Sequence, residues 1–142
     1  MEILTGIAMG IGLILLMILI RPITTTIHEL GHALPALWST DGPVTVYVGS
    51  YGNIENSTSF QLGRLQYIFK MNLFDWNIGM CRHDAKTSLR DELLIILGGP
   101  VASLIFGLLL WFFYSSFDGE LIRFVVAVFI VSTILDFVVN IW

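Results

Sequence analysis

Two histidines and a glutamate stand close together in an apolar part of the chain, with the spacing of a metal site. His28, Glu29 and His32 occur within residues 26–34. On a helix, residues four apart project from one face, so the two imidazoles can bind a single Zn²⁺. Glu29 can then reach a metal-bound water and take its proton. The alternative is two satisfied core histidines beside an exposed carboxylate, and the complete five-residue spacing favours the metal site.

Catalytic zinc normally takes three protein ligands and a water, and the two histidines supply two of them. Asp136 is a candidate third ligand, because a carboxylate inside an apolar span needs a partner such as a metal. A hydrogen bond from Asn140, or from hydroxyl groups of a neighbouring helix, would also satisfy it. We favour a ligand beyond Trp142, with the 142-residue chain a truncated form of little activity. Cys81 and His83 are weak evidence for a second metal site, and we interpret them as an ordinary loop pair.

The composition is that of an integral membrane protein. Hydrophobic residues make up 56% of the chain and charged residues only 13%. The mean hydropathy of +0.82 also exceeds the values of soluble domains. The length of 142 residues fits one domain, residues 1–142, and the net charge of −4 argues against a nucleic-acid partner. The single cysteine excludes an internal disulfide.

Four apolar stretches predict helices at about residues 3–20, 23–38, 93–114 and 121–142. We therefore expect an all-α integral membrane protein of three to four transmembrane helices with a small β-hairpin insertion. Pro22, between the first two stretches, suits either the first turn of a new helix or a bend in one long helix, and both alternatives stay open. Pro35 is expected to kink or end the second stretch.

The polar insertion, residues 39–90, is expected to hold the β structure. Residues 44–48 are β-branched and aromatic, and residues 59–69 alternate in part, so the two segments predict a hairpin. Lipid cannot satisfy an open sheet edge, so this hairpin must lie at the surface or inside protein. The aromatic-rich residues 74–80 are typical of a membrane interface.

The third apolar stretch has a start signal and a face of small residues. Ser88, followed by acidic residues, resembles the beginning of a capping box. Gly99, Ser103 and Gly107 recur every four residues and predict a smooth face where another backbone can approach. Pro100 predicts a kink within the span.

The sequence resembles the site-2 protease family of intramembrane zinc metalloproteases. The resemblance is carried by His28-Glu29-Leu30-Gly31-His32 and, later, by Gly98-Gly99-Pro100-Val101-Ala102-Ser103 opening into an apolar helix. It implies that sheet segments near the active site hold the substrate as an added strand, although a purely structural hairpin is the alternative. It also implies a third zinc ligand in an Asp-Gly pair after Asn-x-x-Pro. That motif is missing here, and Asp118-Gly119 lies in a short loop expected at the opposite membrane face.

The predicted function is that of an intramembrane zinc metalloendopeptidase that cleaves transmembrane or juxtamembrane segments of client proteins. Glu29 is the expected catalytic residue, and the cofactor is Zn²⁺ on His28 and His32. A non-catalytic membrane binding module and a metal-binding or metal-transporting relative are the alternatives. Glu29 argues against both, because neither needs a base beside the histidines.

The expected location is the cell (inner) membrane, with residues 39–90 on the cytoplasmic side. Five basic residues lie at or near this insertion and none lies in the short loop of residues 115–120. The expected partners are membrane lipid and a membrane-protein substrate, and the oligomeric state is left open.

Overall fold

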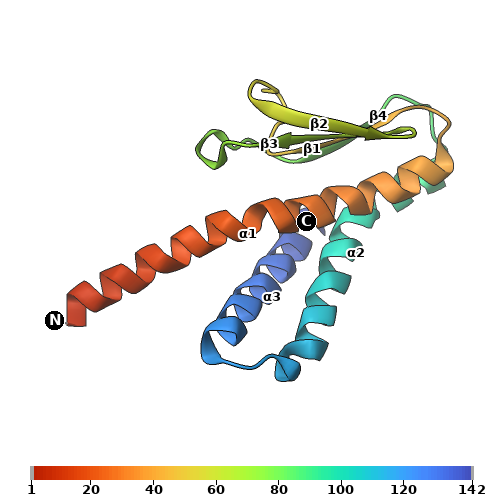
Figure 1. Cartoon of the computed structure of the whole chain (residues 1–142). Helices are drawn as coiled ribbons and strands as arrows, with labels where there is room; N and C mark the ends of the chain where they lie inside the picture. Colours follow the sequence, from red (N-terminus) through yellow and green to blue (C-terminus); the bar gives the residue numbers. More distant parts are fainter. Residues whose placement is uncertain (1, 142) are drawn as a thin grey trace.

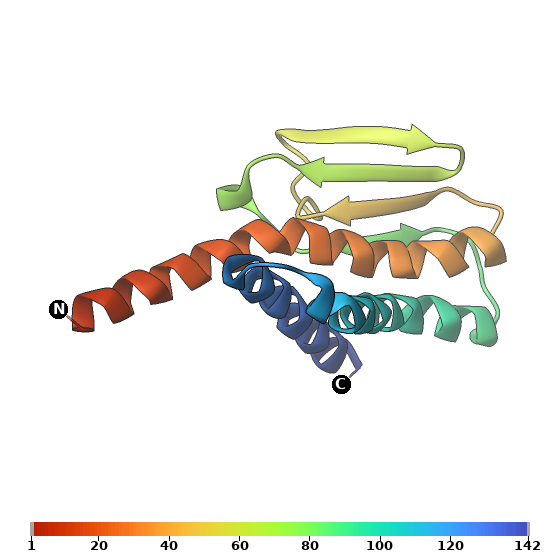
Figure 2. The same ribbon diagram turned by 60° about the horizontal axis from the view of Figure 1, so that its bottom comes forward.

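The computed structural model describes residues 2–141, and most of them are helical (Figure 1). Over this range, three helices are long and apolar enough to cross a membrane: α1 (Glu2–Ser39), α2 (Leu89–Phe113) and α3 (Glu120–Ile141). A small sheet lies along the C-terminal half of α1, and α2 and α3 lie on the other side of that helix (Figures 1 and 2). Trp142, the predicted end of the last helix, falls outside the described residues.

α1 is a single helix that continues through Arg21 and Pro22. It therefore joins the two predicted stretches, 3–20 and 23–38. Pro22 lacks the N–H of a ladder bond, but its fixed φ is compatible with a helix. The hydroxyl of Thr26 donates to the carbonyl of Pro22 at 2.7 Å, and that of Thr24 donates to the carbonyl of Arg21 at 3.2 Å.

α1 continues past Pro35 to Ser39, and several side chains satisfy the carbonyls of its last turn. The hydroxyls of Ser39 and Thr40 donate to the carbonyls four residues back, at 2.8 and 2.7 Å. Arg64 donates to the carbonyls of Leu37 and Thr40. A guanidinium at the C-terminal end of a helix also complements the helix dipole. This contact ties the sheet to the end of α1.

The sheet differs from the predicted hairpin. Its strands in the described residues are β1 (Val44–Val48), β2 (Ser57–Leu62), β3 (Leu65–Lys70) and β4 (Met80–His83), in the order β2-β3-β1-β4. The predicted strand 59–69 is in fact the β2–β3 hairpin, because Gly63 takes a positive φ of 58° and turns the chain there. β1 pairs parallel with β3 and antiparallel with β4. The prediction of a hairpin between residues 44–48 and 59–69 was therefore wrong, because β1 pairs in parallel with β3 and the hairpin is formed by β2 and β3.

β1 lies in the centre of the protein core. Its three valines are fully buried and pack with Ala33 and Ala36 of α1, which are also fully buried. Small side chains on this face of α1 let the sheet approach the helix closely. Burial of the valine side chains contributes about 1.5–3 kcal/mol each. The core therefore fixes the sheet against the half of α1 that carries the histidines.

The contact between α1 and α2 is made by glycines. A Cβ on Gly31 would overlap the carbonyl of Gly98 and the side chain of Ala102, and a Cβ on Gly98 would overlap the carbonyl of Gly31. The two backbones approach each other here. The predicted face of Gly99, Ser103 and Gly107 is buried, and a Cβ on Gly107 would overlap the hydroxyl of Thr133 in α3. Gly99 makes room instead for the ring of His32.

Two remaining predictions concern the ends of α2. The capping interaction is confirmed, because the Ser88 hydroxyl accepts the backbone N–H of Asp91 at 3.2 Å. The helix begins at Leu89, earlier than the predicted residue 93, and ends at Phe113.

Two short 3₁₀ helices, η1 (Leu73–Asp75) and η2 (Tyr114–Ser116), complete the described elements. Of the predicted interfacial segment, Met80 belongs to β4.

Candidate metal centre

His28 and His32 project together from α1, and their rings meet. Their Nε2 atoms lie 3.2 Å apart. The ring planes are nearly perpendicular, at 79°, with centroids 4.9 Å apart. His28 is 8% exposed. The helical spacing predicted this pair, and in the structure the two Nε2 atoms lie next to each other.

The other ring nitrogens are held by α2. His32 Nδ1 lies 2.6 Å from the carbonyl oxygen of Ile95, which can only accept, and 3.3 Å from the backbone N–H of Gly99, which can only donate. The shorter contact, to Ile95, assigns the proton to this nitrogen. His32 Nε2 then presents a lone pair in the neutral ring. His28 Nδ1 lies 3.0 Å from the Ser103 hydroxyl, which can donate or accept. Such partners fix the orientation of metal-binding imidazoles.

The geometry of the pair fits a zinc ion. Two nitrogens bound to one tetrahedral Zn²⁺, each at about 2.0–2.1 Å, would be about 3.3 Å apart. The observed 3.2 Å is close to this separation. If Nδ1 is protonated on both rings, two lone pairs face each other, an arrangement that a cation between them would stabilise. The donor set of two imidazoles is also one that zinc commonly uses.

Glu29 lies beside the histidines and is buried, with 7% of its surface exposed. Its carboxylate accepts a hydrogen bond from the backbone N–H of Cys81 in β4. Gly79 makes this position possible, because a Cβ there would come within 2.6 Å of the carboxylate oxygen Oε1. The general base predicted from the sequence is therefore held between α1 and the start of an edge strand.

Two cavities meet at His28 and Glu29. We name the first the α1–α3 cavity, of about 630 Å³, whose polar lining beyond these two residues is Arg21, Thr24, Thr25, Ser132, Asp136 and Asn140. We name the second the β4 cavity, of about 380 Å³, which is also lined by His32, Cys81, His83, Glu92 and Asn140. The base and one of the histidines are thus reachable from two sides.

Asp136 lines the α1–α3 cavity with His28 and Glu29. Across residues 2–141, however, no three His, Cys, Asp or Glu side chains are grouped closely enough to hold a metal. Asn140, the alternative partner considered for the Asp136 carboxylate, instead donates its amide N–H to the backbone carbonyl of Asp136, at 2.7 Å. The role of Asp136 as third ligand stays a prediction.

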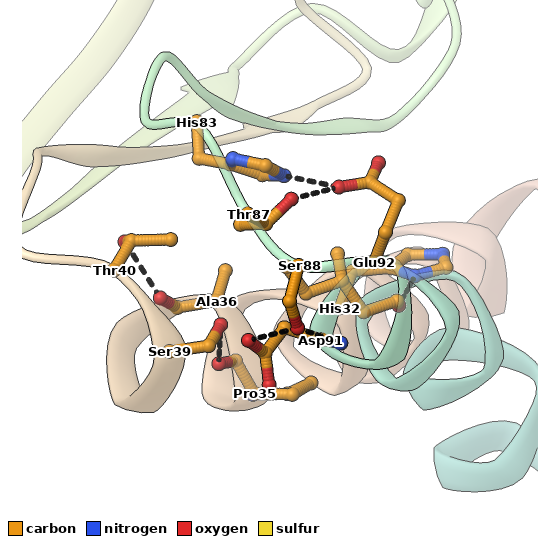
Figure 3. A network of polar contacts seen from close by, with 11 residues as sticks. His32, Pro35, Ala36, Ser39, Thr40, His83, Thr87, Ser88, Asp91 and Glu92 are labelled. Atoms are coloured by element: carbon orange, nitrogen blue, oxygen red, sulfur yellow. Dashed lines mark hydrogen bonds and ion pairs between the residues drawn. The ribbon is translucent and has the colours of Figure 1, made fainter.

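Cys81 and His83 lie in β4 rather than in a loop. Burial raises the pKa of the Cys81 thiol to about 12, with a smaller contribution from the charge of Glu29. In the absence of a metal ion, the thiol is therefore protonated at neutral pH. His83 Nε2 lies 3.9 Å from the Glu92 carboxylate, which also accepts the Thr87 hydroxyl (Figure 3).

Sequence reasoning missed several residues that shape the site. Ser103 holds His28, Gly79 makes room for Glu29, and His83 with Glu92 lines the β4 cavity. Ser103 carried a usable signal, because a polar side chain inside an apolar span tends to face protein. The others depend on contacts between segments far apart in the chain.

Comparisons with protein-family models, curated proteins and solved structures return no match to this chain.

Proposed function

We propose that the chain is a zinc-dependent endopeptidase that acts on membrane-embedded segments of other proteins. The observation that carries this proposal is the 3.2 Å separation of the two histidine Nε2 atoms, beside the buried carboxylate of Glu29. The resemblance of residues 28–32 and 98–103 to the site-2 proteases agrees with it. The three long apolar helices among the described residues suit a protein that works in a membrane.

Each residue of the site has a chemical task in this reaction. His28 and His32 would hold the zinc, with Ser103 and the Ile95 carbonyl keeping the rings in place. When bound, Zn²⁺ would polarise the scissile carbonyl and activate its bound water. Glu29 takes the proton of the attacking water and returns it to the leaving amine. The backbone N–H of Cys81 keeps the Glu29 carboxylate in position.

The segment to be cut must be extended, because the carbonyls of a helix are already hydrogen-bonded. We propose that it lies along β4. This strand is at an edge of the sheet and passes next to Glu29, whose carboxylate accepts the Cys81 N–H. An edge strand offers backbone groups to an added peptide strand. The alternative, in which the sheet only braces α1, predicts that changes to the β4 backbone leave client binding unaltered.

The sharpest test compares the chain with its Glu29→Gln variant on a labelled transmembrane peptide. The amide is nearly isosteric but cannot accept a proton, so turnover should fall at least about 100-fold while zinc content stays the same. Cleavage is read by mass spectrometry, and zinc by elemental analysis of the same samples. Zinc binding with no cleavage by the unaltered chain would favour the non-catalytic metal-binding alternative. Equal cleavage by both proteins would exclude Glu29 as the base.

A further inference from the structure

Arg21 is a charged residue in the wall of the α1–α3 cavity to which the proposed reaction gives no task. It precedes His28 by seven residues, which is about two turns of α1, so both residues lie on nearly the same face. The distance between them along the helix axis is about 10.5 Å at 1.5 Å per residue. One continuous cavity therefore has the metal-binding face at one position and a guanidinium about 10 Å away.

The guanidinium retains free binding capacity. Asp136, on α3, is the carboxylate that faces it across the cavity, and the two interact electrostatically. Even so, the described residues place no carboxylate oxygen within the 4.0 Å of an ion pair with Arg21. A guanidinium has five N–H donors and can bind two carboxylates at once. A cation at membrane depth normally has a partner, so the open donors point to a ligand that enters the cavity.

We propose that Arg21 is a specificity-determining residue, which binds an acidic side chain of the client about three residues from the cut bond. This inference rests on the proposed function, which puts the scissile bond at His28 and Glu29. An extended peptide advances about 3.3 Å per residue, so about three residues cover the distance from His28 to Arg21. The client is thus a transmembrane segment with one Asp or Glu near its cut position.

The rest of the cavity is suited to such a segment. Ile14, Met17 and Ile18 of α1 and Val139 of α3 line it with apolar side chains. Thr25, Ser132 and Asn140 add hydroxyl and amide groups that can bond the backbone of an unwound peptide. A carboxylate at this depth is costly in lipid, and pairing with Arg21 offsets that cost. An acidic residue would therefore favour transfer of the client from lipid into the cavity.

The test uses the full chain in lipid nanodiscs with synthetic 24-residue Leu/Ala/Gly transmembrane peptides. A single Asp, with Asn as its counterpart, is moved one position at a time along the peptide. The cut is mapped separately in the peptide without acidic residues. Binding of each peptide to the Glu29→Gln variant is measured by fluorescence anisotropy, and cleavage by the unaltered chain is measured in parallel. The same scan is repeated in the Arg21→Gln background. Arg90→Gln is the matched control, because Arg90 is exposed and outside both cavities.

We expect the Asp peptide to bind at least about tenfold more tightly than its Asn counterpart at three residues from the cut, on one side. Arg21→Gln should remove this preference, and Arg90→Gln should keep it. The proposed role of Arg21 is overturned if affinity does not depend on the position of the Asp, or if the same preferred position persists with Arg21→Gln. This holds whether or not the peptides are cut. Cleavage with an affinity that does not depend on the position of the Asp leaves the proposed function standing. Arg21-dependent binding of an acidic peptide without any cleavage supports the site and counts against the peptidase.

Discussion

His28 and His32 owe their orientation to groups on α2 rather than to α1. Spacing on a helix brings two rings to one face, but it leaves each ring free to rotate. The Ile95 carbonyl and the Ser103 hydroxyl remove that freedom, and Gly99 leaves space for the His32 ring. The geometry of the histidine pair therefore depends on two helices, and loss of their contact should loosen it.

We expect one equivalent of zinc per chain, bound through His28 and His32. Replacing either residue with Ala should lower zinc affinity at least about 100-fold, because one remaining imidazole is a weak ligand. Zinc content after dialysis against a mild chelator measures the effect, and His83→Ala is the control histidine variant. Full zinc retention in the His28→Ala/His32→Ala double variant would rule out this site.

Asp136 has two competing roles, as third zinc ligand and as partner of Arg21. If it is a ligand, Asp136→Ala should weaken zinc binding as strongly as His28→Ala does. If it mainly faces Arg21, zinc affinity should stay within about twofold. We expect the second outcome, because Asp136 lines the α1–α3 cavity with Arg21 and the two side chains interact electrostatically. Zinc titration of the two variants side by side decides between the roles.

At the level of elements, β4 connects the sheet with the site. Its pairing with β1 fixes it in the sheet, while Cys81 presents its N–H to Glu29. Gly79 comes just before β4 and packs against Glu29 and Thr25. The position of the base thus depends on an edge strand about 50 residues later in the chain.

Cys81→Pro removes that N–H, whereas Cys81→Ala keeps it and removes only the thiol. A hydrogen bond to a charged group is worth about 1.5–3 kcal/mol, so Cys81→Pro should lower kcat/KM roughly tenfold or more relative to Cys81→Ala. The N–H is donated to Glu29, so proline should leave the β1–β4 pairing in place. Circular dichroism and zinc content check that both variants fold. Equal kcat/KM values for the two variants would contradict the proposed role of this backbone group.

At the level of the whole molecule, α1 is longer than a membrane is thick. Its 38 residues extend about 57 Å, compared with about 30 Å for the hydrocarbon core. In the view of Figure 1 it lies at an angle to α2 and α3. Its C-terminal half lies along the sheet, where the candidate site is, and its apolar N-terminal half is exposed.

We expect the sheet on the cytoplasmic side of the membrane. The basic residues in and beside the insertion are Arg64, Lys70, Arg82, Lys86 and Arg90, and such residues favour that side. A cysteine introduced at Ser57, in a Cys81→Ala background, should resist impermeant thiol reagents in intact cells and react after the cells are opened. A cysteine at Ser115, in the other loop, should show the opposite pattern. Rapid labelling at position 57 from outside would reverse the orientation.

The sequence by itself determined what depends on local pattern. Apolar runs gave the three helices that are long enough for a membrane, and the i, i+4 spacing put His28 and His32 on one face. The cap at Ser88 could also be predicted, because it is formed by residues only three positions apart.

The tertiary structure decided what depends on distant contacts. It joined the helix through Pro22, built a mixed sheet from segments that are separated in sequence, and brought Ser103 and Cys81 to His28 and Glu29. Strand pairing and packing join residues 20 to 80 positions apart, and no periodicity in the chain encodes which of them will meet.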